Sequence, residues 1–268
     1  MTIDAAVLTV SGVAVSFGGN QVLTNVDLKF THGFNGLIGP NGAGKTTLFN
    51  LISGYVKPAA GSVEMNGARI SGLDQIKVAR AGIGRTFQSP RLVLDATVME
   101  NALLGRHSLY RWGHFAELIQ WPAARAEERR SREICMQALA QFGLAELAHV
   151  KADSLPLGSQ KLVEVARALV SEPKVVLLDE PAAGLGVDDI DVMLKGLRAY
   201  ADTTGICFVI IEHDLELVSS LCHTVNVLDY GRIIASGTPS EITNNDLVVE
   251  AYLGAGFKAE PKQAVAAR

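Results

Sequence analysis

One glycine-rich segment carries the clearest chemical signal of the sequence. It fits the spacing G-x-x-x-x-G-K-[ST] at every fixed position. Its residues are Gly39, Pro40, Asn41, Gly42, Ala43, Gly44, Lys45, Thr46 and Thr47. An apolar run over residues 34–38 precedes the segment, and apolar residues at helical spacing follow it over residues 48–52. This order of strand, loop and helix predicts a loop that binds phosphate groups.

The chemistry of such a loop follows from its backbone. Glycines let the chain turn tightly, so that several N–H groups point into one concave surface. The helix that follows adds the positive end of its dipole. We expect Lys45 to reach the terminal phosphates of a nucleotide and the Thr46 hydroxyl to hold Mg²⁺. The alternative is a glycine-rich turn with a solvated lysine, which the flanking strand and helix disfavour.

A second, acidic signal ends the apolar run 175–178. Asp179 and Glu180 follow that run directly. A continuous apolar strand is typical of a buried parallel sheet, and ligands bind at the carboxyl edge of such a sheet. We expect Asp179 to hold Mg²⁺, directly or through water, and Glu180 to orient and polarise a water beside the terminal phosphate. Two acids at a helix N-terminus are the alternative, and the phosphate loop favours the first interpretation.

His213 follows the next expected strand, over residues 206–211. From the carboxyl end of that strand it would face the same phosphate as Glu180. A lone histidine after a strand is usually a packing or surface residue, and from this residue alone that interpretation stays open. Its place in the order of the motifs favours a role in the site.

Length, composition and charge limit the class of protein. The chain has 268 residues, 48% of them hydrophobic, which is enough for a substantial core. A net charge of −4 gives no general indication of a nucleic acid partner. No apolar run approaches the roughly 20 residues of a membrane helix, and the first four residues lack the pattern of a secretory signal. We expect a soluble, cytosolic protein with at most a peripheral role at a membrane.

Along the chain, strand patterns and helix patterns alternate, with one helical insertion. A turn at 18–20 joins the first two strands as an antiparallel pair. The end from 257 to 268 is expected to be frayed. The expected strands are 8–17, 22–30, 63–65, 83–88, 175–178, 206–211, 225–228 and 232–235, and the expected helical regions are 98–150, 189–202 and 215–222.

These motifs, in this order, resemble the ATP-binding subunits of ABC transporters over residues 8–254. Phe87 and Gln88 look like the family's Q-loop, which implies that Gln88 contacts Mg²⁺ and the attacking water and relays the nucleotide state to a transmembrane partner. His213 resembles the family's switch histidine, a hydrogen-bond partner of the γ-phosphate. Phe17 looks like the aromatic residue that stacks on adenine, with a Phe packed in the core of the hairpin as the alternative.

The segment 155–160 occupies the place of the family signature Leu-Ser-Gly-Gly-Gln. The resemblance implies that the backbone at Gly158, near a helix N-terminus, caps the γ-phosphate held by a second subunit. Pro156 replaces the serine, and Ser159 stands where glutamine is usual. Gly186 stands in the D-loop where the wider family has Asp. These departures concern the contact between subunits and not the nucleotide site within the chain.

Several short segments resemble the branched-chain amino acid importer type: 85–92, 97–101, 211–214, 237–242 and 250–254. This resemblance implies an ATPase that energises import of a small polar solute, a branched-chain or related amino acid, with ATP and Mg²⁺ as cofactors. The implied partners are two membrane permease subunits, a second ATP-binding subunit, homologous or identical, and a separate solute-binding protein, with no nucleic acid. The implied location is cytoplasmic, peripheral on the inner face of the plasma membrane.

The motifs and the resemblance together predict an α/β fold. It is a P-loop NTPase core with a mixed, mostly parallel sheet, an N-terminal antiparallel β subdomain and an inserted α-helical subdomain. The expected core covers 1–92 and 161–240, the helical subdomain 93–160 carries the signature segment at its end, and 241–268 form a C-terminal helix and frayed tail. The implied catalytic residues are Glu180, His213 and Gln88, and the implied metal ligands are Thr46, Gln88 and Asp179.

Three other functions are compatible with parts of the sequence. A soluble ABC ATPase of repair or translation would carry long coiled coils or two cassettes, and this chain shows neither pattern. A nucleotide-regulated adaptor with little hydrolysis would explain the altered signature and Gly186. A P-loop kinase is the weakest alternative, because it gives His213 and the signature-like helix no role.

Overall fold

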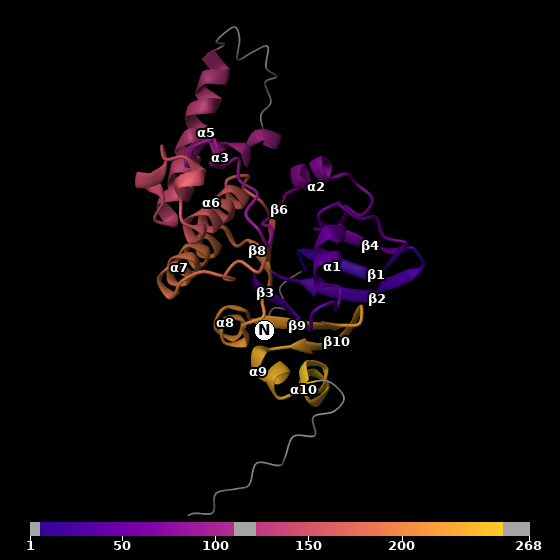
Figure 1. Cartoon of the computed structure of the whole chain (residues 1–268). Coiled ribbons are helices and arrows are strands. Elements are labelled where there is room, and N and C mark those ends of the chain that lie inside the picture. The colour runs from indigo at the N-terminus through magenta and orange to yellow at the C-terminus, as the bar shows by residue number, and fades with distance from the viewer. Residues whose placement is uncertain (1–5, 110–121, 254–268) are drawn as a thin grey trace, which may run out of the picture.

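The computed structural model describes residues 6–109 and 122–253. The sequence predictions for the first four residues and for the frayed end at 257–268 lie outside these residues, as does the middle of the helical insertion at 110–121. Two sheets organise the described chain. Figure 1 shows the antiparallel sheet with α1 and α2 on one side of the parallel strands, and α3, α5, α6 and α7 on the other.

The first sheet is antiparallel and has the strand order β2-β1-β4-β5. The pairing of the first two strands through the turn after Phe17 is as predicted from the sequence. Alternate side chains of β1 and β2 are buried, as expected for strands with one covered face. The strands are β1 Leu8–Phe17, β2 Asn20–Phe30, β4 Ala60–Met65 and β5 Ala68–Arg69.

The second sheet has the order β10-β9-β3-β8-β7-β6. Neighbours from β9 to β6 run parallel, and only β10 is antiparallel, so the predicted mixed, mostly parallel sheet is confirmed. The adjacent strands β8 and β7 are buried along their whole length. The strands are β3 Gly33–Ile38, β6 Ile83–Arg85, β7 Val175–Asp179, β8 Cys207–Ile211, β9 Thr224–Asp229 and β10 Arg232–Gly237.

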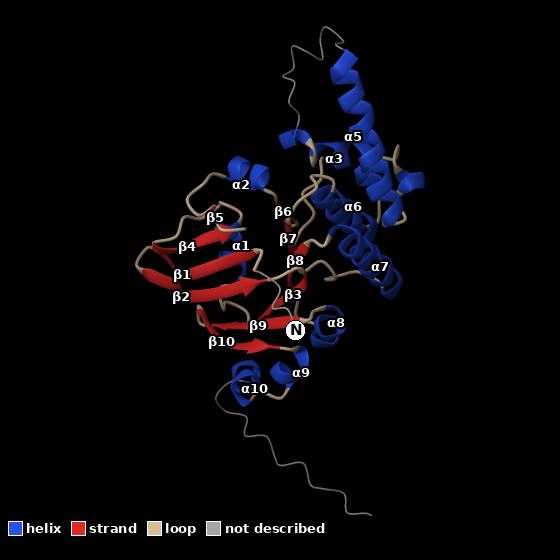
Figure 2. Cartoon of the chain, turned by 180° about the vertical axis from the view of Figure 1, so that it is seen from behind, coloured by secondary structure: helices blue, strands red, loops and turns tan. Residues whose placement is uncertain are grey.

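Two hydrophobic cores lie on opposite faces of this sheet, and the alternation of side chains along each strand explains the division. Val176 and Leu178 of β7 enter the core shared with the helices α3, α5, α6 and α7. Val175 and Leu177, one residue out of phase, enter the core shared with α1 and the antiparallel sheet. The six-stranded sheet is therefore the layer that joins both halves of the structure (Figure 2).

The helices surround the two sheets. They are α1 Lys45–Ile52, α2 Gln75–Ala81, α3 Val98–Leu104, α5 Pro122–Gln141, α6 Leu157–Leu169, α7 Val187–Thr204, α8 Leu215–Leu221, α9 Pro239–Thr243 and α10 Asp246–Leu253. Capping boxes begin two of them, at Thr97 for α3 and at Thr238 for α9. Three single 3₁₀ turns lie at His107–Leu109, Ala145–Leu147 and Ala152–Ser154.

Two boundaries differ from the sequence prediction. The strand expected over 83–88 ends at Arg85, because the Asp179 N–H donates to the Thr86 hydroxyl and the chain then leaves the sheet. The helical region expected over 98–150 is interrupted. α3 ends at Leu104, where Gly105 runs so close to α6 that a Cβ would lie 2.2 Å from the Arg167 carbonyl oxygen. The subdomain boundaries at 92, 160 and 240 remain predictions.

Candidate nucleotide-binding site

The strand register brings the predicted functional segments to one edge of the sheet. Asp179 of β7 pairs with Ile211 of β8, and Leu37 of β3 pairs with the same Ile211. Arg85, the last residue of β6, pairs with Leu177 of β7. Because these strands are parallel, the segments that follow them emerge side by side at the carboxyl edge. Those segments contain the phosphate loop, Gln88, Glu180 and His213.

The phosphate loop has the backbone that its glycines permit. Gly39, Gly42 and Gly44 have φ values of +149°, +80° and +108°, a region that residues with a Cβ rarely adopt. At Gly39 a Cβ would also lie 1.9 Å from the Leu228 carbonyl oxygen of β9. α1 begins at Lys45 without a side-chain cap, so its first N–H groups and its dipole face the loop.

Lys45 lies inside this curve. Its Nζ donates hydrogen bonds to the carbonyl oxygens of Gly39 at 2.6 Å and Pro40 at 2.9 Å. Burial lowers the pKa of Lys45, and the nearby Glu180 and Asp179 carboxylates oppose that shift. A lysine ammonium group beside a glycine loop and the uncapped N-terminus of α1 suits a polyphosphate chain, so the residues present fit a nucleoside triphosphate.

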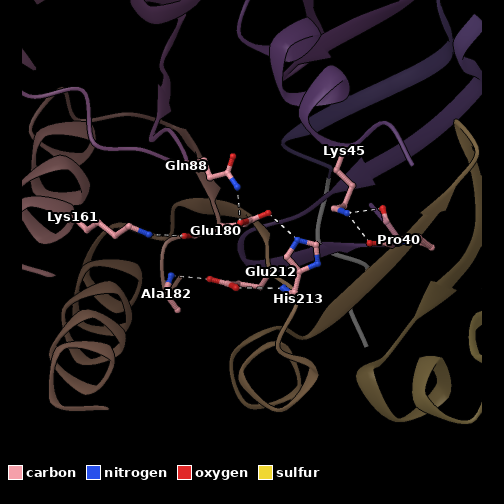
Figure 3. A network of polar contacts seen from close by, with 9 residues as sticks. Pro40, Lys45, Gln88, Lys161, Glu180, Ala182, Glu212 and His213 are labelled. Atoms are coloured by element: carbon pink, nitrogen blue, oxygen red, sulfur yellow. Dashed lines mark hydrogen bonds and ion pairs between the residues drawn. The ribbon is translucent and has the colours of Figure 1, made fainter. Parts of the chain in front are cut away.

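Glu180 connects the predicted catalytic side chains, as Figure 3 shows. Its Oε2 accepts a hydrogen bond from Gln88 Nε2 at 3.0 Å, and its Oε1 lies 2.8 Å from His213 Nε2. Glu180 also has a left-handed backbone, with a φ of +48°. The structure therefore brings together three residues that are 92 and 33 positions apart in the chain.

Asp179 lies beneath this cluster and is 5% exposed. Burial raises the pKa of its carboxyl group, and the Arg85 guanidinium opposes the shift. Arg85 Nη2 lies 3.5 Å from Asp179 Oδ2, while its other nitrogen Nη1 donates to Asn50 and Ser53. Arg85 was not among the site residues predicted from the sequence. A charged residue inside an otherwise apolar strand pattern is the signal that could have found it.

The same guanidinium packs beside the aromatic ring that precedes Gln88. The centre of the Arg85 guanidinium lies 4.9 Å from the Phe87 ring centroid, and that of Arg91 lies 4.0 Å from it. Tyr55 meets the ring edge-on at 6.0 Å. These cation–π contacts fix the direction in which the chain leaves β6.

The predicted metal ligands offer oxygen atoms of three kinds. Thr46 supplies a hydroxyl in the exposed first turn of α1, Asp179 a carboxylate at the end of β7, and Gln88 an amide oxygen. Oxygen donors with few carboxylates suit Mg²⁺, which keeps several waters and binds substrate phosphates as well. The donor set therefore fits Mg²⁺.

Phe17 and Gly158 lie on other elements, at the end of β1 and the start of α6. The Phe17 side chain is 51% exposed, so it is not packed in the core of the hairpin. Gly158 is buried, and a Cβ there would lie 2.2 Å from Asp189 Oδ2 of α7. Pro156 and Gly186 are the N-cap residues of α6 and α7, and neither makes a side-chain cap.

Comparisons with known proteins decide the family. The model described as "ABC transporter" matches residues 23–183, and the model described as "Branched-chain amino acid ATP-binding cassette transporter" matches residues 232–258. The chain belongs to the ABC transporter family. The predicted resemblance is thereby confirmed, and this ABC protein is an ATP-binding subunit with ATPase activity, in a family that works with membrane permeases.

Individual relatives agree with this assignment. The ABC subunit is 39% identical over 251 residues to the high-affinity branched-chain amino acid transport ATP-binding protein LivG of Salmonella typhimurium, covering 92% of this chain and 97% of the relative. It is 38% identical to BraF of Pseudomonas aeruginosa, a protein of the same description, covering 92% and 98%. A nucleotide-free ATP-binding cassette from an ABC transporter superposes with a TM-score of 0.80 at 32% identity, covering 93% and 100%.

None of the helices within residues 6–109 and 122–253 of this ABC subunit is long and apolar enough to cross a membrane.

We predict that Phe17→Ala weakens ATP and GTP binding by similar amounts, about 1–3 kcal/mol, because stacking on an aromatic face tolerates either base. Fluorescence titration with both nucleotides measures the effect. Phe17→Tyr is the matched control and should retain affinity. An unchanged affinity in Phe17→Ala would show that the exposed ring does not contact the base.

Lys45→Ala should abolish productive nucleotide binding, since the phosphates would lose their principal counter-charge within the loop. The exposed Lys195 of α7 supplies a control, Lys195→Ala, which removes one positive charge far along the chain from the loop. Calorimetric titration with ATP separates the two variants. Micromolar ATP affinity in Lys45→Ala contradicts the role given to this lysine.

Proposed function

We propose that this ABC subunit hydrolyses ATP with Glu180 as the general base and Gln88 and His213 as its partners. The observation that carries the proposal is the contact of one carboxylate with both other side chains, at the sheet edge where the phosphate loop begins. A general base must reach the water that it activates and stay ionised.

Each residue of the site has a separate role in ATP hydrolysis. Lys45 and the backbone of the phosphate loop bind the β- and γ-phosphates, and Glu180 accepts a proton from the water that attacks the γ-phosphorus. The bond from that phosphorus to the bridging oxygen breaks, so that ADP and phosphate leave. His213 donates to the γ-phosphate, and Gln88 orients the water. Thr46, Asp179 and Gln88 would hold Mg²⁺, which when bound offsets charge on the phosphate oxygens.

The dimeric assembly follows from the same argument. A second ATP-binding subunit, identical or homologous, would place its own α6 N-terminus, at Gly158, against the phosphate bound by the first. ATP then shifts the equilibrium toward the closed dimer by binding that form more tightly. The missing caps at Pro156 and Gly186 fit a contact made by the backbone of α6 and α7.

For the transport role, the relatives supply the solute class. LivG and BraF are described as branched-chain amino acid transport proteins. We therefore assign to this chain the import of a branched-chain or related amino acid, through two permease subunits and with a separate solute-binding protein. Its place is peripheral, on the cytoplasmic face of the plasma membrane.

Replacement of the proposed base tests the hydrolytic mechanism. Glu180→Gln should retain ATP binding and lower the turnover number by about 10²–10⁴-fold, because the amide cannot accept the proton of the attacking water. Steady-state release of phosphate and nucleotide titration measure both quantities. Turnover near that of the unaltered chain would remove Glu180 from the catalytic role.

Purification of the tagged chain from its native membranes tests the transport role. We expect permease subunits to co-purify, and the complex in vesicles to take up labelled leucine when ATP is present. Vesicles with Glu180→Gln serve as the control and should not accumulate it. ATP hydrolysis coupled to uptake of a different solute contradicts the proposed solute class. Absence of ATP hydrolysis, both in the isolated chain and in the complex, supports a nucleotide-regulated adaptor instead.

A further inference from the structure

The turn that carries Glu180 is held by two buried charged side chains from other elements. Lys161 of α6 donates hydrogen bonds through its Nζ to the carbonyl oxygens of Glu180, at 3.3 Å, and of Ala183. Glu212, which follows β8, accepts a hydrogen bond at Oε1 from the Ala182 N–H at 2.8 Å. Figure 3 shows the turn between these two side chains.

Glu212 also reaches the other residue that contacts the Glu180 carboxylate. Its Oε2 accepts a hydrogen bond from the His213 N–H at 3.3 Å, while its Oε1 bonds to the turn. One carboxylate thereby ties the backbone beneath Glu180 to the backbone beneath His213. The 2.8 Å contact between the Glu180 and His213 side chains rests on this shared support.

Both charges lie deep in the structure: Lys161 is 7% exposed and Glu212 is 4% exposed. Burial lowers the pKa of Lys161, and Glu212 opposes that shift more than any other charge. A buried charge is costly unless an opposite charge and hydrogen bonds compensate it. Burial also raises the pKa of Glu212, and the hydrogen bonds that it accepts from the Ala182 and His213 N–H groups oppose that shift. Lys161 is compensated by Glu212 and by the carbonyl oxygens of the turn, while Glu212 is compensated by backbone N–H groups on the turn and at His213.

The backbone that they hold is an unfavourable one. Glu180 has a φ of +48°, in the left-handed region where a Cβ crowds the following carbonyl group. A residue keeps such a strained conformation only where contacts with the surrounding structure hold its backbone in place. At Glu180 they do so on both sides, since its N–H donates to the Ile211 carbonyl oxygen at 2.9 Å and its own carbonyl oxygen accepts from Lys161.

We propose that Lys161 and Glu212 are positioning residues that hold the 180–183 turn so that the Glu180 carboxylate points at Gln88 and His213. The proposal rests on the catalytic role given above to Glu180. Neither side chain touches the reacting atoms. Without Lys161 the turn relaxes from its left-handed conformation. The Glu180 carboxylate is then no longer within hydrogen-bond reach of the attacking water.

The test compares turnover and ATP affinity in the full chain, alone and in the complex from membranes. Lys161→Met should lower kcat by about 10- to 100-fold, the cost of a base displaced by roughly 1 Å. Its dissociation constant for ATP should stay within about twofold, because Lys161 makes no contact with the phosphate loop. Lys161→Arg keeps the positive charge and N–H donors and should retain kcat. Lys195→Met, at an exposed position of α7, should leave kcat unchanged.

A double variant distinguishes positioning from a general structural role. In the Glu180→Gln background Lys161 has no base left to position, so adding Lys161→Met should leave the residual kcat unchanged. An equal fold-loss in both backgrounds overturns the proposal, as does an unchanged kcat in Lys161→Met or a parallel loss of ATP affinity. Should Lys161→Met fail to fold, the variant with Lys161→Met and Glu212→Gln removes both charges and is judged by the same criteria.

The two proposals fail in different ways. Full activity in Glu180→Gln refutes the catalytic role of Glu180 and, with it, the reason for holding the turn. An inactive Glu180→Gln beside a fully active Lys161→Met refutes only the role of Lys161.

Discussion

The parallel pairing of β6, β7, β8 and β3 is the constraint on which the whole site depends. The parallel register pairs Arg85 with Leu177, Asp179 with Ile211 and Leu37 with the same Ile211, so that the loops after these strands all leave the sheet at its carboxyl edge. A parallel sheet must be covered on both faces, and the two hydrophobic cores provide that cover. Because both faces are covered, the polar side chains of the site lie at the carboxyl edge, where the strands end.

α6 is the element that joins the remote parts of this arrangement. Charged residues at Lys161, Glu164 and Arg167 are spaced three apart on one face of a helix that is otherwise largely apolar and buried. Lys161 holds the turn after β7, while Glu164 and Arg167 bond to the backbone N–H and carbonyl oxygen of Arg91, just after Gln88. A shift of the helix that begins beside Gly158 therefore moves both segments that meet at Glu180.

The sequence was sufficient where local chemistry decides the structure. The phosphate loop could be predicted because its glycines, its lysine and the flanking strand and helix all lie within 20 consecutive residues of the chain. The edge position of Asp179 followed from the apolar run before it. The roles assigned to these residues remain predictions, since the structure shows their places and contacts and not their reactions.

The sequence was insufficient where the outcome depends on distant partners. Nothing in the spacing of α6 indicates that Lys161 reaches two carbonyl groups beyond β7, because that contact depends on the rotation of the helix about its axis. The early end of β6 depends on a hydrogen bond between Thr86 and a backbone group 93 positions away. Phe17 was ambiguous for a similar reason, since only the packing around a hairpin tells an exposed ring from a buried one.

Arg85 contacts both the carboxylate at the end of β7 and the aromatic ring that precedes Gln88. Its guanidinium group touches the Asp179 carboxylate on one side and the Phe87 ring on the other, and its Nε is a buried nitrogen without a hydrogen-bond partner among the described residues. Any force that displaces that ring from outside must also change the electrostatic potential felt by the carboxylate. Under the metal role proposed for Asp179, pressure on the Phe87 ring would therefore change the affinity of this site for Mg²⁺.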